Sequence, residues 1–142
     1  MKNVCLAFVA MVLAYSSVEA QQKESDFQQV VQTLTYYLEG GTNNDFETLK
    51  RAFHETATMK FIGDSYKEVN AIEFFQKGMK PGPKQDRQTE IIDVQIQGNA
   101  ASARLKITYP TFSFFDFMNL LKIDGQWKIV NKIFYRQAHE SE

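Results

Sequence analysis

The chain has 142 residues, of which 44% are hydrophobic, and its formal net charge is −1 at pH 7. That size and composition favour a single globular domain with its own core, and the near-neutral charge argues against nucleic acid as a partner. The one cysteine, Cys5, lies in an N-terminal apolar segment. Disulfide bonds and thiol chemistry are therefore not expected in the domain itself.

The first twenty residues have the features of a secretory signal peptide. Lys2 supplies a positive charge, an apolar run follows over residues 4–14, and Val18 and Ala20 suit a cleavage site. The run is too short for a membrane span, which needs about 20 apolar residues. We expect cleavage after Ala20, export to the periplasm or the medium, no membrane attachment afterwards, and a single domain over residues 21–142.

The first helix of that domain is predicted over residues 26–39. Ser25 and Gln28 form a capping box in front of apolar residues that recur at helical spacing. The pair Gly40-Gly41 is expected to end the helix, because glycine favours the conformation found at helix C-termini. The apolar stripe predicts that this helix packs on another layer.

The following stretch predicts short elements. Asn44 is the expected N-cap of a second helix that extends to about Phe53. Alternating residues over 56–69 predict a hairpin, and residues 70–78 predict a brief helix capped by an asparagine. The charged, proline-containing segment 80–87 predicts a surface loop.

Residues 87–109 predict a longer hairpin about the turn Gly98-Asn99. Counting outward from a two-residue turn places Ile92 opposite Leu105 on a wholly apolar face. The same count places Arg104 on the other face, looking outward.

The hairpin over residues 112–135 carries the strongest strand signal. Its Asp124-Gly125 turn accepts positive φ angles, and aromatic and β-branched residues lie on either side. The same counting places Asp116 and Asn131 on the face that we expect to be concave, and Lys132 on the opposite face, looking outward. The expected concave face consists of Phe114, Asp116, Met118, Leu120, Ile129, Asn131, Ile133 and Tyr135, and the outer face of Phe115, Phe117, Asn119, Leu121, Lys128, Val130, Lys132 and Phe134.

Both faces of this hairpin are apolar. A face in contact with water would not carry Phe115, Phe117 and Leu121 together. We expect helices to cover one face and a second copy of the chain to cover part of the other, which gives a homodimer through the sheet.

The order of elements over residues 26–136 resembles the cone-shaped, cystatin-like α+β fold of the nuclear transport factor 2-like superfamily. The stretches Tyr37-Leu-Glu-Gly-Gly, Leu49-Lys-Arg-Ala-Phe-His54 and Phe-Met-Asn-Leu-Leu-Lys-Ile-Asp-Gly-Gln-Trp-Lys-Ile-Val-Asn-Lys-Ile-Phe, residues 117–134, resemble its lumazine-binding, SnoaL-like branch. The resemblance implies N-terminal helices packed on a curved antiparallel sheet, a homodimer, and a pocket between the helices and the concave face. The superfamily contains isomerases, cyclases and dehydratases beside non-catalytic binders.

Two residues are candidates for catalysis. Asp116 on the expected concave face is a carboxylate whose neutral form an apolar pocket favours, so it could act as a general base or acid. The structural alternative is that it accepts hydrogen bonds and only maintains the sheet geometry. His54, which follows the second predicted helix, could transfer protons or cap that helix. No His or Cys stands at metal-ligand spacing beside them, so we expect neither a metal nor a cofactor.

The residues expected to line the pocket are Tyr37, Met59, Phe75, Tyr109, Phe112, Phe114, Asn131 and Tyr135. The simpler alternative is that the aromatic members of this set are plain core. The resulting prediction is a domain that binds a small organic molecule, without established catalysis. The alternatives are a SnoaL-like isomerase, cyclase or hydratase that uses the pocket carboxylate as a general base, and a protein-interaction module that uses the outer sheet face.

Overall fold

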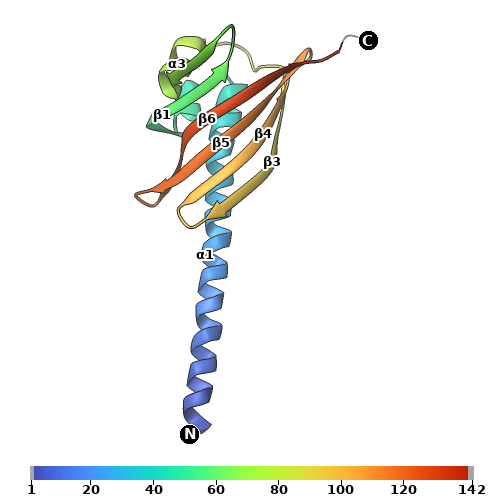
Figure 1. Cartoon of the computed structure of the whole chain (residues 1–142). Helices are drawn as coiled ribbons and strands as arrows, with labels where there is room; N and C mark the ends of the chain where they lie inside the picture. The colour runs from blue at the N-terminus through green and yellow to red at the C-terminus, as the bar shows by residue number, and fades with distance from the viewer. Residues whose placement is uncertain (1, 141–142) are drawn as a thin grey trace.

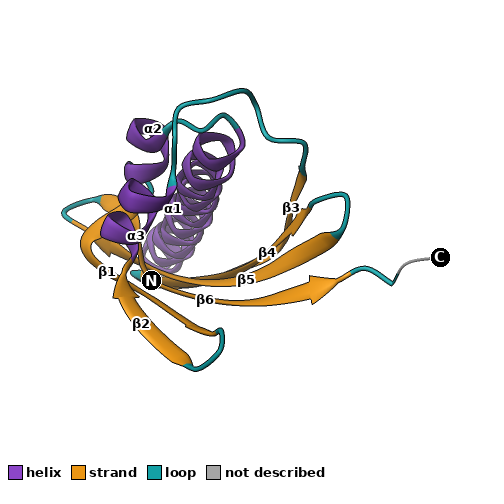
Figure 2. Ribbon diagram, turned by 90° about the horizontal axis from the view of Figure 1, so that it is seen from above, coloured by secondary structure: helices purple, strands orange, loops and turns teal. Residues whose placement is uncertain are grey.

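The computed structural model describes the backbone of residues 2–140 and the side chains of residues 18, 19, 21–23 and 25–140. The helices lie together on one face of a curved, open sheet of six strands (Figure 2). The elements in chain order are α1 (Lys2–Thr42), α2 (Phe46–Lys50), β1 (Phe53–Ile62), β2 (Tyr66–Asn70), α3 (Ala71–Gly78), β3 (Gln88–Gln97), β4 (Ala100–Thr108), β5 (Phe112–Ile123) and β6 (Gln126–Ala138). The predicted α+β fold with helices packed on a curved sheet is confirmed.

The strands lie in the order β2-β1-β6-β5-β4-β3. Neighbouring strands are antiparallel except β1 and β6, which run parallel, so the sheet is mixed where an antiparallel one was expected. The parallel pair arises because α3 and the loop after it carry the chain from the edge strand β2 to the opposite edge strand β3.

Helix α1 is longer than predicted at both ends, and its N-terminal half projects beyond the sheet (Figure 1). Ser25 is not a cap: it lies inside the helix, where its hydroxyl accepts a hydrogen bond of 3.2 Å from Gln29. A helix N-cap satisfies backbone N–H groups that have no carbonyl partner. The N–H groups near Ser25 bond to carbonyl groups of the preceding helical turn, so no cap is needed there. The predicted signal peptide falls on this projecting half; Met1 and the side chains of residues 2–17 and 20 lie outside the described residues. No helix in the described part of the chain is long and apolar enough to cross a membrane.

The glycine pair in α1 does not end the helix, which continues to Thr42. A Cβ atom on Gly40 would lie only 2.7 Å from the Cα atom of Leu49, and one on Gly41 would collide with the guanidinium group of Arg87. The glycines therefore allow α2 and Arg87 to approach α1 closely. The prediction that they end the helix was wrong because it considered only backbone conformation and not this packing.

Helix α2 begins and ends differently from the prediction. Its N-cap is Asp45, whose carboxylate accepts a hydrogen bond of 3.1 Å from the Thr48 backbone N–H. Asn44 instead has a positive φ of 54°, which the extended N-cap position excludes. The helix ends at Lys50, and Phe53 is the first residue of β1.

The remaining short elements match the prediction. β1 and β2 form the expected hairpin, and α3 has the expected Asn70 cap, which accepts from the Glu73 N–H at 3.1 Å. The segment before β3 is the expected loop, although Gln85 and Arg87 at its end turn back toward α1.

A bulge changes the register of the hairpin of β3 and β4. Near the turn the pairs, such as Ile96 with Ala101, are those that a two-residue turn at Gly98-Asn99 predicts. Farther out Ile91, and not Ile92, lies opposite Leu105, and Ile92 is exposed. Arg104 lies on the outer face as predicted, where it pairs with Asp93. The inserted residue changes the face on which each later side chain lies.

A second bulge has a larger consequence, because it lies in the hairpin of β5 and β6. Leu120 pairs with Ile129 as predicted, but Asn119 pairs with Asn131, so Val130 is the extra residue. Beyond this point the faces of β6 are exchanged: Lys132 and Phe134 point to the concave side, and Asn131, Ile133 and Tyr135 point outward. The predicted faces of these five residues were therefore wrong. The pairing of β1 with β6 is irregular at the same level.

Candidate functional site

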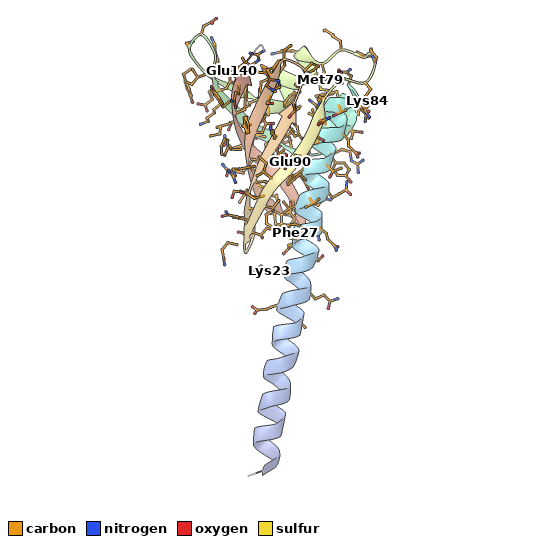
Figure 3. All side chains as sticks on the ribbon, turned by 90° about the vertical axis from the view of Figure 1, so that its right-hand side faces the viewer. Lys23, Phe27, Met79, Lys84, Glu90 and Glu140 are labelled. Atoms are coloured by element: carbon orange, nitrogen blue, oxygen red, sulfur yellow. The ribbon has the colours of Figure 1, made fainter. Side chains whose placement is uncertain are left out.

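A cavity of about 210 Å³ lies between the helices and the concave face of the sheet. It is lined by Tyr37, Gly41, Leu49, Met59, Phe74, Phe75, Met79, Gln85, Arg87, Ile107, Tyr109, Phe114, Lys132 and Phe134. Met79 belongs to the end of the domain that lies away from the projecting half of α1 (Figure 3). Since a cavity of about 150 Å³ in another protein holds benzene, this one has room for a molecule of one or two rings.

The floor of the cavity carries a buried polar cluster of Tyr37, Asp116 and Lys132. The Tyr37 hydroxyl donates to Asp116 Oδ2 at 2.7 Å, and the Lys132 ammonium donates to Asp116 Oδ1 in an ion pair. The three residues are between 1% and 5% exposed. Asp116 lies beneath the other two and is not itself part of the lining. Tyr37 and Lys132 are therefore the members of the cluster that a ligand would touch.

Burial controls the ionisation of this cluster. It lowers the pKa of Lys132 from its usual value of 10.5, and the negative charge of Asp116 opposes that change. Burial also raises the pKa of Tyr37 well above 10.0, and the negative charge of Asp116 acts in the same direction. Tyr37 is thus a neutral hydroxyl donor near pH 7.

Aromatic rings form the walls of the cavity. The Phe75 ring lies 5.9 Å from Tyr37 in an edge-to-face contact, and the Phe114 and Phe134 rings meet edge-to-face at 5.4 Å. The Lys132 ammonium lies 4.3 Å from the centroid of Phe134. Aromatic faces stabilise a buried cation, so this ring and Asp116 together hold the amine in place.

Arg87 forms part of the opposite wall. Its Nε donates to Thr42 Oγ1 at 2.8 Å, its Nη1 to the Tyr109 hydroxyl at 2.9 Å and its Nη2 to the Leu38 carbonyl at 2.9 Å. The Tyr109 hydroxyl in turn donates to Gln85 at 2.8 Å. The guanidinium is therefore held in one orientation before any ligand arrives.

The structure brings together most of the predicted pocket residues. Those that line the cavity are Tyr37, Met59, Phe75, Tyr109 and Phe114. Phe112 lies behind the lining and stacks on the Tyr109 ring at 4.7 Å. Asn131 and Tyr135 lie on the outer face of the sheet, because the bulge at Val130 exchanges the faces of β6.

The two candidate catalytic residues are not neighbours in a shared site. Asp116 is under the cavity floor, and both of its oxygen atoms accept hydrogen bonds. His54 is the second residue of β1 and lies outside the lining, with its Nδ1 atom 2.8 Å from the Thr56 hydroxyl. The structure therefore places Asp116, but not His54, where it can influence a bound molecule.

Sequence reasoning missed Lys132 and Arg87. Counting residues from the turn assigned Lys132 to the outer face, and Arg87 was placed in a surface loop. One signal for Lys132 was available. Asp116 lies among phenylalanines in the sequence, and a buried carboxylate needs a positively charged partner, which Lys132 on the neighbouring strand of the hairpin could provide. No pattern in the sequence indicated that Arg87 would turn back to α1.

No group of three or more His, Cys, Asp or Glu side chains within the described residues could hold a metal ion. The polar groups that face the cavity are instead an amine, a guanidinium, an amide and two phenols. Of these groups, the amine and the guanidinium keep N–H donors for a ligand, and both place positive charge beside it.

Comparisons with known proteins agree with this architecture. The profile of the family described as "Putative lumazine-binding" matches residues 25–135. A solved nuclear transport factor 2-like protein of unknown function from Shewanella baltica is 30% identical, with a TM-score of 0.72 over 82% of this chain and 96% of that one. A similar protein from Methylobacillus flagellatus is also 30% identical, with a TM-score of 0.70 over 82% and 94%. Among curated proteins, the chain is 25% identical to aldolase FrzH from Cladobotryum in an alignment 117 positions long, which covers 78% of this chain and 91% of that protein.

Proposed function

Because this chain belongs to the lumazine-binding family of nuclear transport factor 2-like proteins, we propose that it binds a small organic molecule in the cavity between its helices and sheet. The observation that carries the proposal is the cavity itself. It is lined mainly by apolar side chains, and its few polar groups converge from the floor and one wall. Pockets of this composition are typical of small-molecule sites.

Native mass spectrometry of protein purified from its source tests this function. We expect a retained small molecule that is released on denaturation. A variant with less room, Met59→Phe, should lose it, because Met59 is 1% exposed and its side chain faces the cavity. Ile62→Phe on the exposed end of β1 is the matched control, since Ile62 is 76% exposed and should not affect retention. Retention that is unchanged in Met59→Phe would contradict binding in this cavity.

An enzyme is the second candidate function, favoured by the similarity to a curated aldolase. In this reading Tyr37 and Lys132 touch the substrate, the Lys132 ammonium stabilises a developing enolate oxygen with an N–H that Asp116 does not use, and Asp116 holds both side chains. The arrangement suits an isomerase, cyclase, hydratase or aldolase acting next to a carbonyl group. Loss of turnover in a folded Lys132→Gln protein, with unchanged substrate affinity, would support catalysis; unchanged turnover would exclude this role for the ammonium.

We also propose that the protein is exported and then acts as a homodimer. The signal-like residues 1–20 support export to the periplasm or the medium, and N-terminal sequencing of protein from its source should begin at Gln21. The outer face of the sheet supports the dimer, because it exposes several large apolar side chains. They are Ile62, Phe117, Leu121, Ile133 and Tyr135, each at least 40% exposed.

A further inference from the structure

The charges on the cavity wall do not balance. The cavity lining contains two cations, Arg87 and Lys132. None of the described residues that line the cavity is an aspartate or a glutamate. Lys132 has its counter-ion in Asp116 beneath the floor. Arg87 forms no ion pair within residues 25–140, and its three hydrogen bonds all go to neutral oxygen atoms. One positive charge at the cavity is therefore left without a protein counter-charge.

The hydrogen bonds of Arg87 leave donors for a ligand. A guanidinium has five N–H donors, and here Nε, Nη1 and Nη2 each use one on Thr42, Tyr109 and Leu38. Nη1 and Nη2 thus each keep one N–H that has no acceptor in the described part of the chain. Two N–H groups of one guanidinium match the two oxygen atoms of a carboxylate.

The position of Arg87 is prepared by its surroundings. The absence of a Cβ at Gly41 leaves the space that the guanidinium occupies against α1. Tyr109 accepts from it and is held by Gln85, so this wall loses little side-chain freedom when an anion binds. The positive charge of Arg87 also acts across the cavity, because it adds to the lowering of the pKa of Lys132 that burial mainly causes.

We propose that the ligand of this cavity is a small aromatic carboxylate, whose anionic group lies against Arg87 and whose rings lie among Phe75, Phe114 and Phe134. The inference rests on the proposed function and adds the chemical class of the ligand. A neutral molecule of the same shape lies against Arg87 without neutralising its charge, so it forgoes the charge-assisted hydrogen bonds that the carboxylate forms.

Isothermal titration calorimetry with 2-naphthoate and 2-naphthamide tests the inference. The two probes share a two-ring body and differ in charge. We expect the carboxylate to bind at least about tenfold more tightly, as for a hydrogen bond to a charged group. Equal affinities would overturn the anion inference and leave small-molecule binding intact. If neither probe binds, the proposed ligand class is wrong. The proposed function is tested separately, by looking for a small molecule retained by protein purified from its source.

Two variants locate the preference, and a third serves as the control. Arg87→Gln should abolish the preference for the carboxylate, whereas Arg104→Gln, with the same loss of charge on the outer face, should keep it. If Arg87→Gln does not fold, as judged by circular dichroism, Gly41→Ala replaces it, because the added methyl group displaces the guanidinium without removing its charge. A full preference in a folded Arg87→Gln or Gly41→Ala protein would overturn the assignment to Arg87.

Discussion

Asp116 is a buried acid whose role depends on the two side chains above it. Its carboxylate is 1% exposed and accepts from Tyr37 and Lys132, so it holds both groups at the cavity floor. Removing a charge from water costs several kcal/mol, and here the ion pair, the hydrogen bond and the Phe134 ring offset that cost. Loss of either Asp116 or Lys132 alone should therefore destabilise the protein more than loss of both charges together.

Replacement of Lys132 by methionine should lower the free energy of unfolding by about 3–5 kcal/mol, because it leaves the charge of Asp116 buried and unpaired. The double variant Asp116→Asn with Lys132→Met should recover much of that loss. Urea denaturation measures both values. Lys60→Met is the control: Lys60 pairs with Glu68 at the surface, and its loss should cost less than about 1 kcal/mol. Equal losses for Lys132→Met and Lys60→Met would contradict this account.

At the scale of elements, α1 forms the back of the cavity and is joined closely to α2. Gly40 makes that contact possible, because a side chain there would meet the backbone of Leu49. The contact has a direct consequence for the site, since Leu49 and the neighbouring Gly41 both line the cavity.

Gly40→Ala should therefore be destabilising, although alanine favours helices by about 1 kcal/mol over glycine. Forcing α1 and α2 apart costs about 1–3 kcal/mol beyond that gain, as in other overpacked sites. The matched control is Gly78→Ala in α3, where a Cβ atom meets nothing within 4 Å. Thermal unfolding should show a lower Tm for Gly40→Ala and an unchanged or higher Tm for Gly78→Ala; the opposite order would refute the close-contact role.

Asp26 joins α1 to the end of the β5–β6 hairpin. Its carboxylate accepts from Lys122 at 2.7 Å and from the Trp127 ring nitrogen at 3.1 Å. The hydrogen bond from Lys122 is the main cause that lowers the pKa of Asp26 from its usual value of 3.8. A lowered pKa means that the folded state binds this proton less readily than the unfolded state does.

The stability that Asp26 contributes should consequently be present above pH 3.8 and be lost as the pH falls through the lowered pKa. In urea denaturation at about pH 6 and pH 2, the difference in unfolding free energy between the wild type and Asp26→Asn should be larger at the higher pH. A difference independent of pH would show that the carboxylate charge is not what joins the helix to the hairpin.

At the scale of the whole molecule, the two faces of the sheet differ in what they expose. The concave face carries the cavity, and the outer face exposes apolar side chains that water alone would not favour as a group. A dimer through the outer face would leave the cavity of each copy intact.

Sedimentation equilibrium at micromolar concentration should give twice the mass of one chain, which is 16.4 kDa before any cleavage. Ile133→Glu, on the outer face at 45% exposure, should shift the mass toward one chain because it places charge in the interface. Phe27→Glu on α1, at 49% exposure, is the control and should stay dimeric. A wild-type mass equal to one chain would refute the dimer.

Local sequence patterns were sufficient to predict the fold class, the family and the hairpins, because each of these depends mainly on residues that are close together in the chain. The Asp124-Gly125 turn has the positive φ angles that were predicted, and the Asn70 cap and the pairing next to each turn are as expected. The sequence also identified five of the residues that line the cavity, since aromatic and apolar residues on α1, α3 and the strands have few other places to go.

The identity of the polar groups that face the cavity, in contrast, could not be predicted from local patterns. A single extra residue at Val130 moves Lys132 to the floor of the cavity and Asn131 and Tyr135 to the outer face. Because side chains alternate along a strand, one inserted residue exchanges the faces of everything after it, and no local pattern records where the insertion falls. Arg87 likewise reaches the cavity through contacts with α1, which lies more than forty residues earlier in the chain.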